Sequence, residues 1–136
     1  MARRAPISVA LAVATLAATG CGGGGDRTQA RAVAERFYAA VQRGDGATAC
    51  EQLSTDTRSN LESQEGKPCR RAIGSLGLGR ARVTRVQVFL TNAKVDLADG
   101  HSAFLGRGPD GWQLSAVGCS AQGKPADRPF DCALEA

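Results

Sequence analysis

The chain has 136 residues, of which 43% are hydrophobic, and a formal net charge of +4, which suits one small globular domain and leaves no room for two cores. Arg3 and Arg4 lie in a leader-like segment, and without these two the net charge falls from +4 to +2. A weak, scattered charge and only four Phe, one Trp and one Tyr exclude nucleic acid as an expected partner.

Residues 1–20 have the composition of an export signal. Arg3 and Arg4 precede the uncharged, Ala- and Val-rich run Ala5–Thr19, and a basic start before a short apolar run is typical of secretory leaders. The run has about 15 residues, fewer than the roughly 20 that a helix needs to span a bilayer. We therefore expect residues 1–20 to be a signal peptide.

Cys21 follows three small residues, Ala18, Thr19 and Gly20. This arrangement resembles the lipobox of bacterial lipoproteins, in which the cysteine sulfur forms a thioether to diacylglycerol; the usual Leu is replaced by Ala18. The resemblance implies a lipid anchor on Cys21 at the outer face of the bacterial cytoplasmic membrane, so that membrane lipid is the first expected partner. An ordinary signal peptide that leaves Cys21 as an odd thiol is the alternative.

Residues 21–26 combine the expected lipidated cysteine with four consecutive glycines, Gly22–Gly25. Glycine-rich segments behave as flexible chains with an average reach of about 5–6 Å × √n. We predict that residues 21–26 form a tether of about 12 Å, and that residues 27–136 form the folded domain.

Four further cysteines, Cys50, Cys69, Cys119 and Cys132, lie in the expected domain. Disulfides are typical of exported proteins, and four cysteines allow three pairings. We favour Cys50–Cys69 and Cys119–Cys132, because the members of each pair are close in the sequence and lie within one structural region. Zinc is the alternative, but the spacings match no common zinc motif and His101 is the only histidine, so we expect no metal and no cofactor.

The segment from Asp26 to Asp45 contains the clearest helix signal. Its apolar residues recur at i, i+3, i+4 and i+7, with Asp26 or Thr28 available as a cap and Gly44 as the stop. Three shorter helices are expected after it: 46–53 capped by Asp45, a stretch from Ser54 to near Leu61, and, after a loop over 63–68, a helix opened by Pro68 that stops at Gly77.

From Arg80 onward the hydrophobic period changes to two, which indicates β-strands. Val86, Val88 and Leu90 are predicted to share a buried face, and Asp99-Gly100 is a strong hairpin signal. The expected strands are 80–91, 93–98, 101–107 and 112–119, with 129–134 as a short final strand or a segment along the sheet. Such short connections make neighbouring strands antiparallel.

Helices followed by an antiparallel meander predict an α+β fold, with the N-terminal helices packed on a curved sheet of four to five strands. The segment "RAVAERFYAAVQRGDGATACEQLS" and a meander ending in "GWQLSAVGC" resemble the lipid-anchored NTF2-like proteins of actinobacteria. The resemblance covers most of residues 27–136. It implies a cone with a cavity at its open end, and it places Asp45 as a helix cap at the tip of the cone.

NTF2-like folds include enzymes as well as binding domains, so the fold alone does not decide the function. Their isomerases and cyclases place an Asp or His base and a Tyr or Asp donor inside the cone. Here Tyr38 is the donor candidate, although a core or rim position without a role in chemistry is the interpretation we favour for it. The expected places of His101 after a turn and of Asp96 on the outer sheet face favour ordinary surface roles. We therefore expect no catalytic residue and no enzyme; an isomerase-like or cyclase-like enzyme acting on a small apolar substrate is the alternative.

The sequence thus predicts a membrane-anchored, extracytoplasmic lipoprotein whose domain binds a small apolar ligand or a neighbouring envelope protein without catalysis. The candidate ligand-binding residues are the aromatic side chains Phe37, Tyr38, Phe104 and Trp112. Polar residues such as Arg85 on the outer sheet face argue against a large dry interface, so we expect a monomer or a weak dimer.

Overall fold

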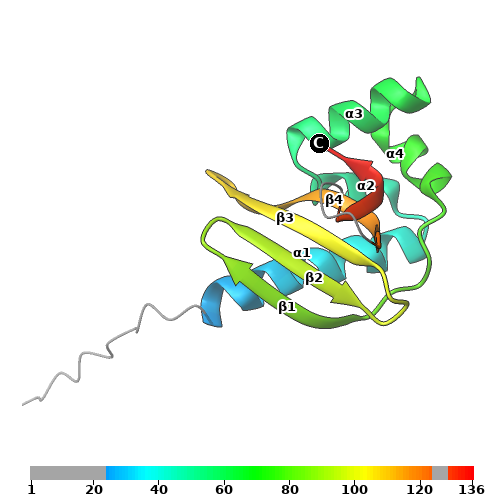
Figure 1. Cartoon of the computed structure of the whole chain (residues 1–136). Helices are drawn as coiled ribbons and strands as arrows, with labels where there is room; N and C mark the ends of the chain where they lie inside the picture. Colours follow the sequence, from blue (N-terminus) through cyan, green and yellow to red (C-terminus); the bar gives the residue numbers. More distant parts are fainter. Residues whose placement is uncertain (1–23, 124–128) are drawn as a thin grey trace, which may run out of the picture.

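The computed structural model describes residues 24–123 and 129–136 (Figure 1). It has the predicted α+β fold, in which a helix-rich N-terminal part precedes a five-stranded antiparallel sheet. Residues 1–20 and Cys21, for which a signal peptide and a lipid anchor are predicted, lie outside the described residues.

The helical part begins earlier than the sequence suggests. The helices of the described chain are α1 (Gly24–Gln42), α2 (Gly46–Glu51), α3 (Thr55–Glu65), α4 (Cys69–Ala72) and the 3₁₀ helix η1 (Ile73–Leu76). Because α1 starts at Gly24, Gly24 and Gly25 are helical, and the predicted tether does not extend to residue 26. The predicted stop of the fourth helical segment at Gly77 is confirmed, since Gly77 is its left-handed cap with φ 62°.

Two short polar side chains begin helices as predicted. The carboxylate of Asp45 accepts a hydrogen bond from the backbone N–H of Thr48 at 3.1 Å, and the hydroxyl of Ser54 accepts one from Thr57 N–H at 3.2 Å. These bonds satisfy first-turn N–H groups that have no partner within the helix. Hydrogen bonding to Thr48 also lowers the pKa of Asp45.

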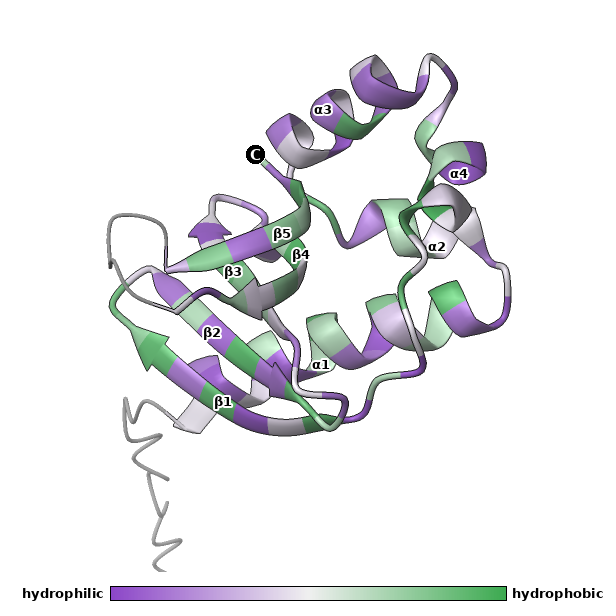
Figure 2. Cartoon of the chain, turned by 45° about the vertical axis from the view of Figure 1, so that its right-hand side comes forward, coloured by the Kyte–Doolittle hydropathy of each residue, from purple (hydrophilic) through white to green (hydrophobic). Residues whose placement is uncertain are grey.

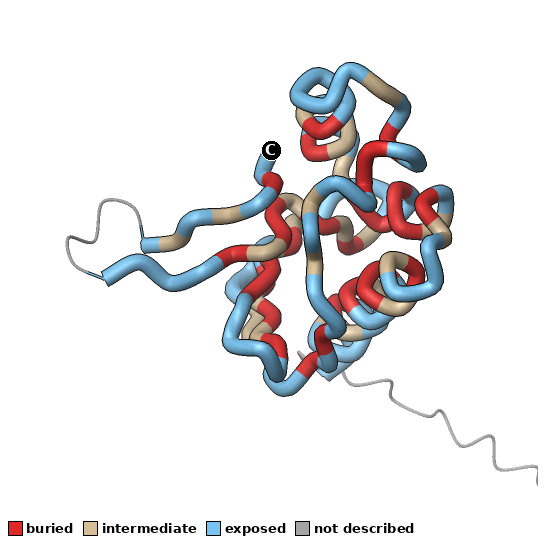
Figure 3. The backbone as a smooth tube through the Cα atoms, turned by 90° about the vertical axis from the view of Figure 1, so that its right-hand side faces the viewer, coloured by how far each residue is buried: buried red, intermediate tan, exposed pale blue. Residues whose placement is uncertain are grey.

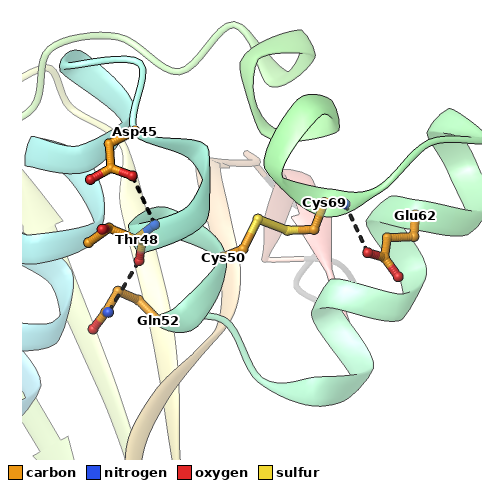
Figure 4. Close-up of a disulfide and its surroundings, with 6 residues drawn as sticks. All are labelled: Asp45, Thr48, Cys50, Gln52, Glu62 and Cys69. Carbon is orange, nitrogen blue, oxygen red and sulfur yellow. Dashed lines mark hydrogen bonds between the residues drawn. A yellow bond between two sulfur atoms is a disulfide. The ribbon is translucent and has the colours of Figure 1, made fainter.

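The predicted end of the third helix near Leu61 is wrong, because α3 continues to Glu65 and ends where Gly66 adopts a left-handed φ of 63°. The added turn connects α3 to the start of α4. Glu62 lies in it, and its carboxylate accepts a 2.8 Å hydrogen bond from the backbone N–H of Cys69 (Figure 4). Glu62 thereby caps α4, whose N-cap residue Pro68 makes no side-chain cap bond.

The strands follow one another in a meander. They are β1 (Val83–Phe89), β2 (Asn92–Leu97), β3 (Ser102–Gly108), β4 (Gly111–Ala121) and β5 (Phe130–Glu135). The sheet order is β1-β2-β3-β4-β5, and each neighbouring pair is antiparallel. The short final strand expected from the sequence is therefore present as β5, paired with β4.

Helix α1 packs against β1, β2 and β4, whereas α3 contacts β4 and β5 (Figures 1 and 2). The alternating residues Ala93, Val95 and Leu97 of β2 face this helix layer and are buried, as the period of two predicts. The buried stretches of α1 and of the sheet lie toward the middle of the molecule (Figure 3). One core therefore joins the two layers.

The prediction that Leu90 shares the buried face of β1 is wrong. β1 ends at Phe89, and Leu90 and Thr91 form the two-residue turn to β2. Leu90 has a φ of +55° and is 92% exposed. Two-residue hairpin turns require positive φ, which Gly, Asn and Asp normally supply, so nothing in the residue types at this position signals the turn.

Both favoured disulfides are present. Cys50–Cys69 joins α2 to α4 (Figure 4), and Cys119–Cys132 joins β4 to β5. Their sequence separations are 19 and 13 residues. In the chain-entropy model, a disulfide that closes a loop of this size stabilises the folded protein by about 3 kcal/mol, because it restricts the unfolded chain. Each of these four sulfurs is bonded to the sulfur of its pair, so none is a free thiolate that could bind zinc. The zinc alternative is therefore wrong.

Gly46 lets α2 approach α4 closely enough for the first bridge. A Cβ atom at Gly46 would overlap the backbone carbonyl oxygen of Arg70, the residue that follows Cys69. Backbone cannot rotate away as a flexible side chain would, so the two helices would have to move apart. The absence of a side chain at position 46 therefore sets the spacing of this helix pair.

We expect Gly46→Ala to lower the free energy of unfolding by about 3 kcal/mol, because overpacking against fixed backbone is destabilising. Gly74→Ala is the matched control, since a Cβ at Gly74 meets nothing within 4 Å, and it should change the same quantity by less than about 1 kcal/mol. Urea unfolding of both variants measures the difference. Equal effects would contradict the assigned contact.

Candidate functional site

A cavity of about 120 Å³ lies at one end of the sheet. It is bounded by α1, by the segment after η1, by the β2–β3 turn and by β4 and β5, with the lining residues Tyr38, Leu76, Gly77, Leu78, Gly79, Leu97, Asp99, His101, Gly118 and Ala133. The β1–β2 turn lies at the opposite end of β2. The cavity thus occupies the end of the molecule away from Leu90.

Tyr38 brings a buried hydroxyl to this cavity. The residue is 2% exposed, and its hydroxyl finds no hydrogen-bond partner among the described residues. Desolvation by burial raises the pKa of Tyr38 to about 12; the backbone of Gly118 is close enough to the hydroxyl to act in the opposite direction but not in hydrogen-bond geometry with it, and the charge of Asp99 adds to the rise. The hydroxyl is therefore a neutral hydrogen-bond donor at ordinary pH.

Gly118 makes room for the cavity. It has a φ of +64° and lies in β4, where the register against β3 shifts. A Cβ atom there would approach Leu78 Cδ2 to 2.8 Å and Ala133 Cβ to 2.9 Å. The irregularity in β4 and the missing side chain thus both open the space beside Tyr38, as bulges often do near binding sites.

Asp99 and His101 form a bonded pair at the same cavity. The backbone N–H of His101 donates to Asp99 Oδ1 at 3.0 Å, and His101 Nδ1 lies 3.2 Å from Asp99 Oδ2. When Nδ1–H donates to a carboxylate, Nε2 remains as the atom that accepts a proton or a ligand hydrogen bond. A hairpin turn is present here as predicted, but the predicted two-residue form at Asp99-Gly100 is wrong, because β2 ends at Leu97, β3 begins at Ser102 and the backbone N–H of Gly100 donates to the carbonyl of Leu97. The connection carries two cavity residues, Asp99 and His101, whose place in the sequence indicates only ordinary turn positions.

Of the four aromatic residues predicted to bind a ligand, the structure brings only Tyr38 to this cavity. Phe37 is fully buried in the core, with its ring centroid 5.0 Å from that of Tyr38. Phe104 alternates with the buried residues Ala103 and Leu105, so it lies on the outer sheet face, where its ring contacts Phe130 at 4.9 Å.

Asp96 also lies on the outer face, as predicted. Its carboxylate pairs with Lys94 Nζ at 2.7 Å and accepts a hydrogen bond from the Ser102 hydroxyl at 3.0 Å. Hydrogen bonding to Lys94 is the main cause of its lowered pKa. Asp96 is therefore an ion-paired surface carboxylate, separate from the cavity.

Trp112 is buried at the other end of α1. Its indole Nε1 donates to Asp26 Oδ1 at 3.4 Å, and the guanidinium of Arg107 lies 2.8 Å from the same carboxylate oxygen. Asp26, expected as a possible helix cap, instead holds the first turn of α1 to the β3–β4 hairpin. Trp112 therefore has a structural role in joining the two layers.

Comparison with the models of known protein families, with curated proteins and with solved structures finds no match to this chain. Within residues 24–123 and 129–136, no helix is long and apolar enough to cross a membrane. In the same part of the chain, no three His, Cys, Asp or Glu side chains are grouped so that they could hold a metal ion. The interpretation of the site therefore depends on the geometry of the cavity.

The cavity combines a polar donor with an apolar wall. Tyr38 supplies the donor and His101 an acceptor, while leucines contributed by β2 and the segment around η1 supply hydrophobic contact. A volume of about 120 Å³ is below the roughly 300 Å³ at which drug-sized pockets begin and close to the roughly 150 Å³ that accommodates benzene. The cavity therefore suits a ligand of about one ring with a single oxygen acceptor.

We expect Tyr38, the only tyrosine of the chain, to ionise with a pKa of about 12 in the folded protein, against about 10 in the unfolded chain. Because the unfolded chain loses this proton first, the free energy of unfolding should fall as the pH rises from about 10 to 12. Tyrosinate absorbance in native and urea-unfolded protein measures both midpoints. A native midpoint near 10 would show that the hydroxyl is solvated.

Proposed function

We propose that the chain is a membrane-anchored extracytoplasmic lipoprotein whose NTF2-like domain binds a small apolar ligand without catalysis. The leader-like residues 1–20 and the lipobox-like sequence before Cys21 support export and lipidation. The two disulfides support the same location, because oxidising compartments outside the cytoplasm are where such bonds persist. With the other four cysteines paired, Cys21 is the odd one, and a thioether would remove its free thiol.

The NTF2-like part of the proposal is supported by a long helix packed along an antiparallel sheet. The cavity lies beside Tyr38 near the C-terminal end of α1, the end that the resemblance assigns to the tip of the cone, so it supports ligand binding and not the cone itself. A neighbouring envelope protein is the other partner class expected from the sequence, but the cavity favours a small molecule.

The observation that carries the binding function is the buried hydroxyl of Tyr38, which has no hydrogen-bond partner within residues 24–123 and 129–136. Leaving such a group without a hydrogen bond is unfavourable by about 1–3 kcal/mol. A ligand oxygen that accepts this bond would recover that free energy while its apolar part contacts Leu76, Leu78 and Leu97. The ligand class is therefore a ketone, amide or ester of about one ring or an equivalent branched chain.

Proton transfer on such a ligand is a second candidate function. The observation that favours it is that Tyr38 and the His101–Asp99 pair line one cavity, since acid–base catalysis needs a base and a donor on the same substrate. Tyr38 would donate to a developing oxyanion, and His101 Nε2 would accept a proton from the adjacent carbon. The small volume argues against the polycyclic substrates of isomerases and cyclases.

We expect cyclohexanone, used as a probe with one ring and one acceptor oxygen, to bind the wild-type protein roughly fivefold to tenfold more tightly than Tyr38→Phe, which lacks the donor. Ligand-observed NMR measures both affinities, and methylcyclohexane, which has no acceptor, should bind the two proteins equally. Equal affinity for cyclohexanone would rule out Tyr38 as the ligand donor. Unfolding of Tyr38→Phe by urea checks that the variant is at least as stable as wild type.

The same NMR samples in D₂O separate the two candidate functions. Protons next to the cyclohexanone carbonyl should exchange no faster with protein than in buffer if the domain only binds. Faster exchange that is lost in His101→Asn would favour the proton-transfer enzyme.

We expect the mature chain, purified from bacterial membranes after expression, to begin at Cys21 and to carry diacylglycerol on its sulfur. Intact-mass measurement shows the cleavage point and the lipid together, and it also reports any co-purifying small molecule. Cys21→Ser is the control and should retain the leader without lipid, because the thioether cannot form. A free thiol at Cys21 behind an intact leader would overturn the anchored lipoprotein.

A further inference from the structure

The β1–β2 turn exposes two neighbouring hydrophobic side chains. Phe89 is 58% exposed and Leu90 is 92% exposed, and they are the exposed large hydrophobic residues of the described chain. Leu90 also has a φ of +55°, a conformation that costs a residue other than Gly, Asn or Asp about 1–2 kcal/mol. An apolar side chain held in a strained, exposed turn points to a function for that side chain.

This turn lies at the same end of the molecule as the start of α1 (Figures 1 and 2). Arg27 and Arg31 of the first turns of α1 line one open groove together with the β1 residues from Thr84 to Phe89. Cys21 precedes Gly24 by three residues, which span at most about 11 Å when extended. An anchor on Cys21 would therefore hold this end of the domain against the membrane.

The charge of this end complements an anionic surface. Arg27 and Arg85 are exposed beside the turn. Of the nearby acidic groups, Asp26 pairs with Arg107 at 2.8 Å and Glu35 pairs with Arg31 at 3.3 Å, whereas Asp110 in the β3–β4 turn has no ion-pair partner among the described residues. The guanidinium groups of Arg27 and Arg85 outnumber this one carboxylate, so this end has a small excess of positive charge.

We infer that Arg27, Arg85, Phe89 and Leu90 form a docking surface for anionic phospholipid in the membrane that holds Cys21. The inference rests on the lipid anchor of the proposed function. Phe89 and Leu90 would enter the headgroup region while Arg27 and Arg85 pair with lipid phosphates, a combination typical of interfacial binding. Weak contacts suffice, because the anchor keeps the surface at a high local concentration.

Docking in this way orients the domain. The cavity beside Tyr38 lies at the far end of β2 from Leu90, so it would face away from the lipid and toward the aqueous side. An anchored domain without this contact would tumble on its tether and present the cavity in all directions.

The test uses the full-length, lipidated protein reconstituted into vesicles that contain brominated lipid. Tryptophan is introduced by Leu90→Trp at the docking surface and by Ser63→Trp, as the matched control, at an exposed position in the C-terminal half of α3. Buried Trp112 is common to both proteins. In phosphatidylglycerol vesicles we expect bromine quenching of Leu90→Trp to be at least twice that of Ser63→Trp.

Charge variants in the Leu90→Trp background test the electrostatic part. Arg27→Gln with Arg85→Gln should lower the ratio of docked to free domain by about fivefold per arginine, and high salt should act in the same direction. Arg70→Gln with Arg71→Gln removes the same charge from α4, at the other end, and should leave quenching unchanged.

Intact mass of each sample distinguishes the possible failures. Protein that carries no lipid on Cys21 would overturn the proposed anchor and this inference with it. Lipidated protein in which Leu90→Trp is quenched no more than Ser63→Trp would overturn the inference alone. Shielding of the new tryptophan from acrylamide in native membranes but not in vesicles would identify a protein partner and would likewise overturn it.

Discussion

The close approach of α1 to the sheet depends on alanine. Ala30, Ala34 and Ala40 are fully buried on this helix, and their short side chains let the helix backbone pack near its neighbours. Phe37 and Tyr38 interrupt this pattern with large side chains. Phe37 completes the core, whereas Tyr38 extends to the edge of the packed region and ends at the cavity.

The two ends of β2 carry surfaces of different chemistry. One end has the exposed turn at Leu90, and the other leads into the Asp99–His101 pair. β2 has six residues, so the two ends are about 20 Å apart at roughly 3.3 Å per residue. If the proposed lipid contact forms at the Leu90 end, this separation would keep the cavity at the other end clear of the headgroups.

Local features of this fold could be predicted from the sequence, and long-range ones could not. The cap at Asp45 and the alternation of β2 depend on residues a few positions apart, and both are confirmed. Leu90 was assigned to the wrong environment, because a turn without Gly or Asn is indistinguishable from a continuing strand. The cavity depends on Tyr38, Asp99 and Gly118, which are far apart in the chain and meet only through the register of the sheet.

The order of the cysteines along the chain has a consequence for biogenesis. Cys50 and Cys69 are 19 residues apart, and both precede Cys119. If the chain is exported N-terminus first, as proposed, Cys50 and Cys69 would reach the oxidising side before Cys119 and Cys132. This order would favour the Cys50–Cys69 bridge over the two other connectivities.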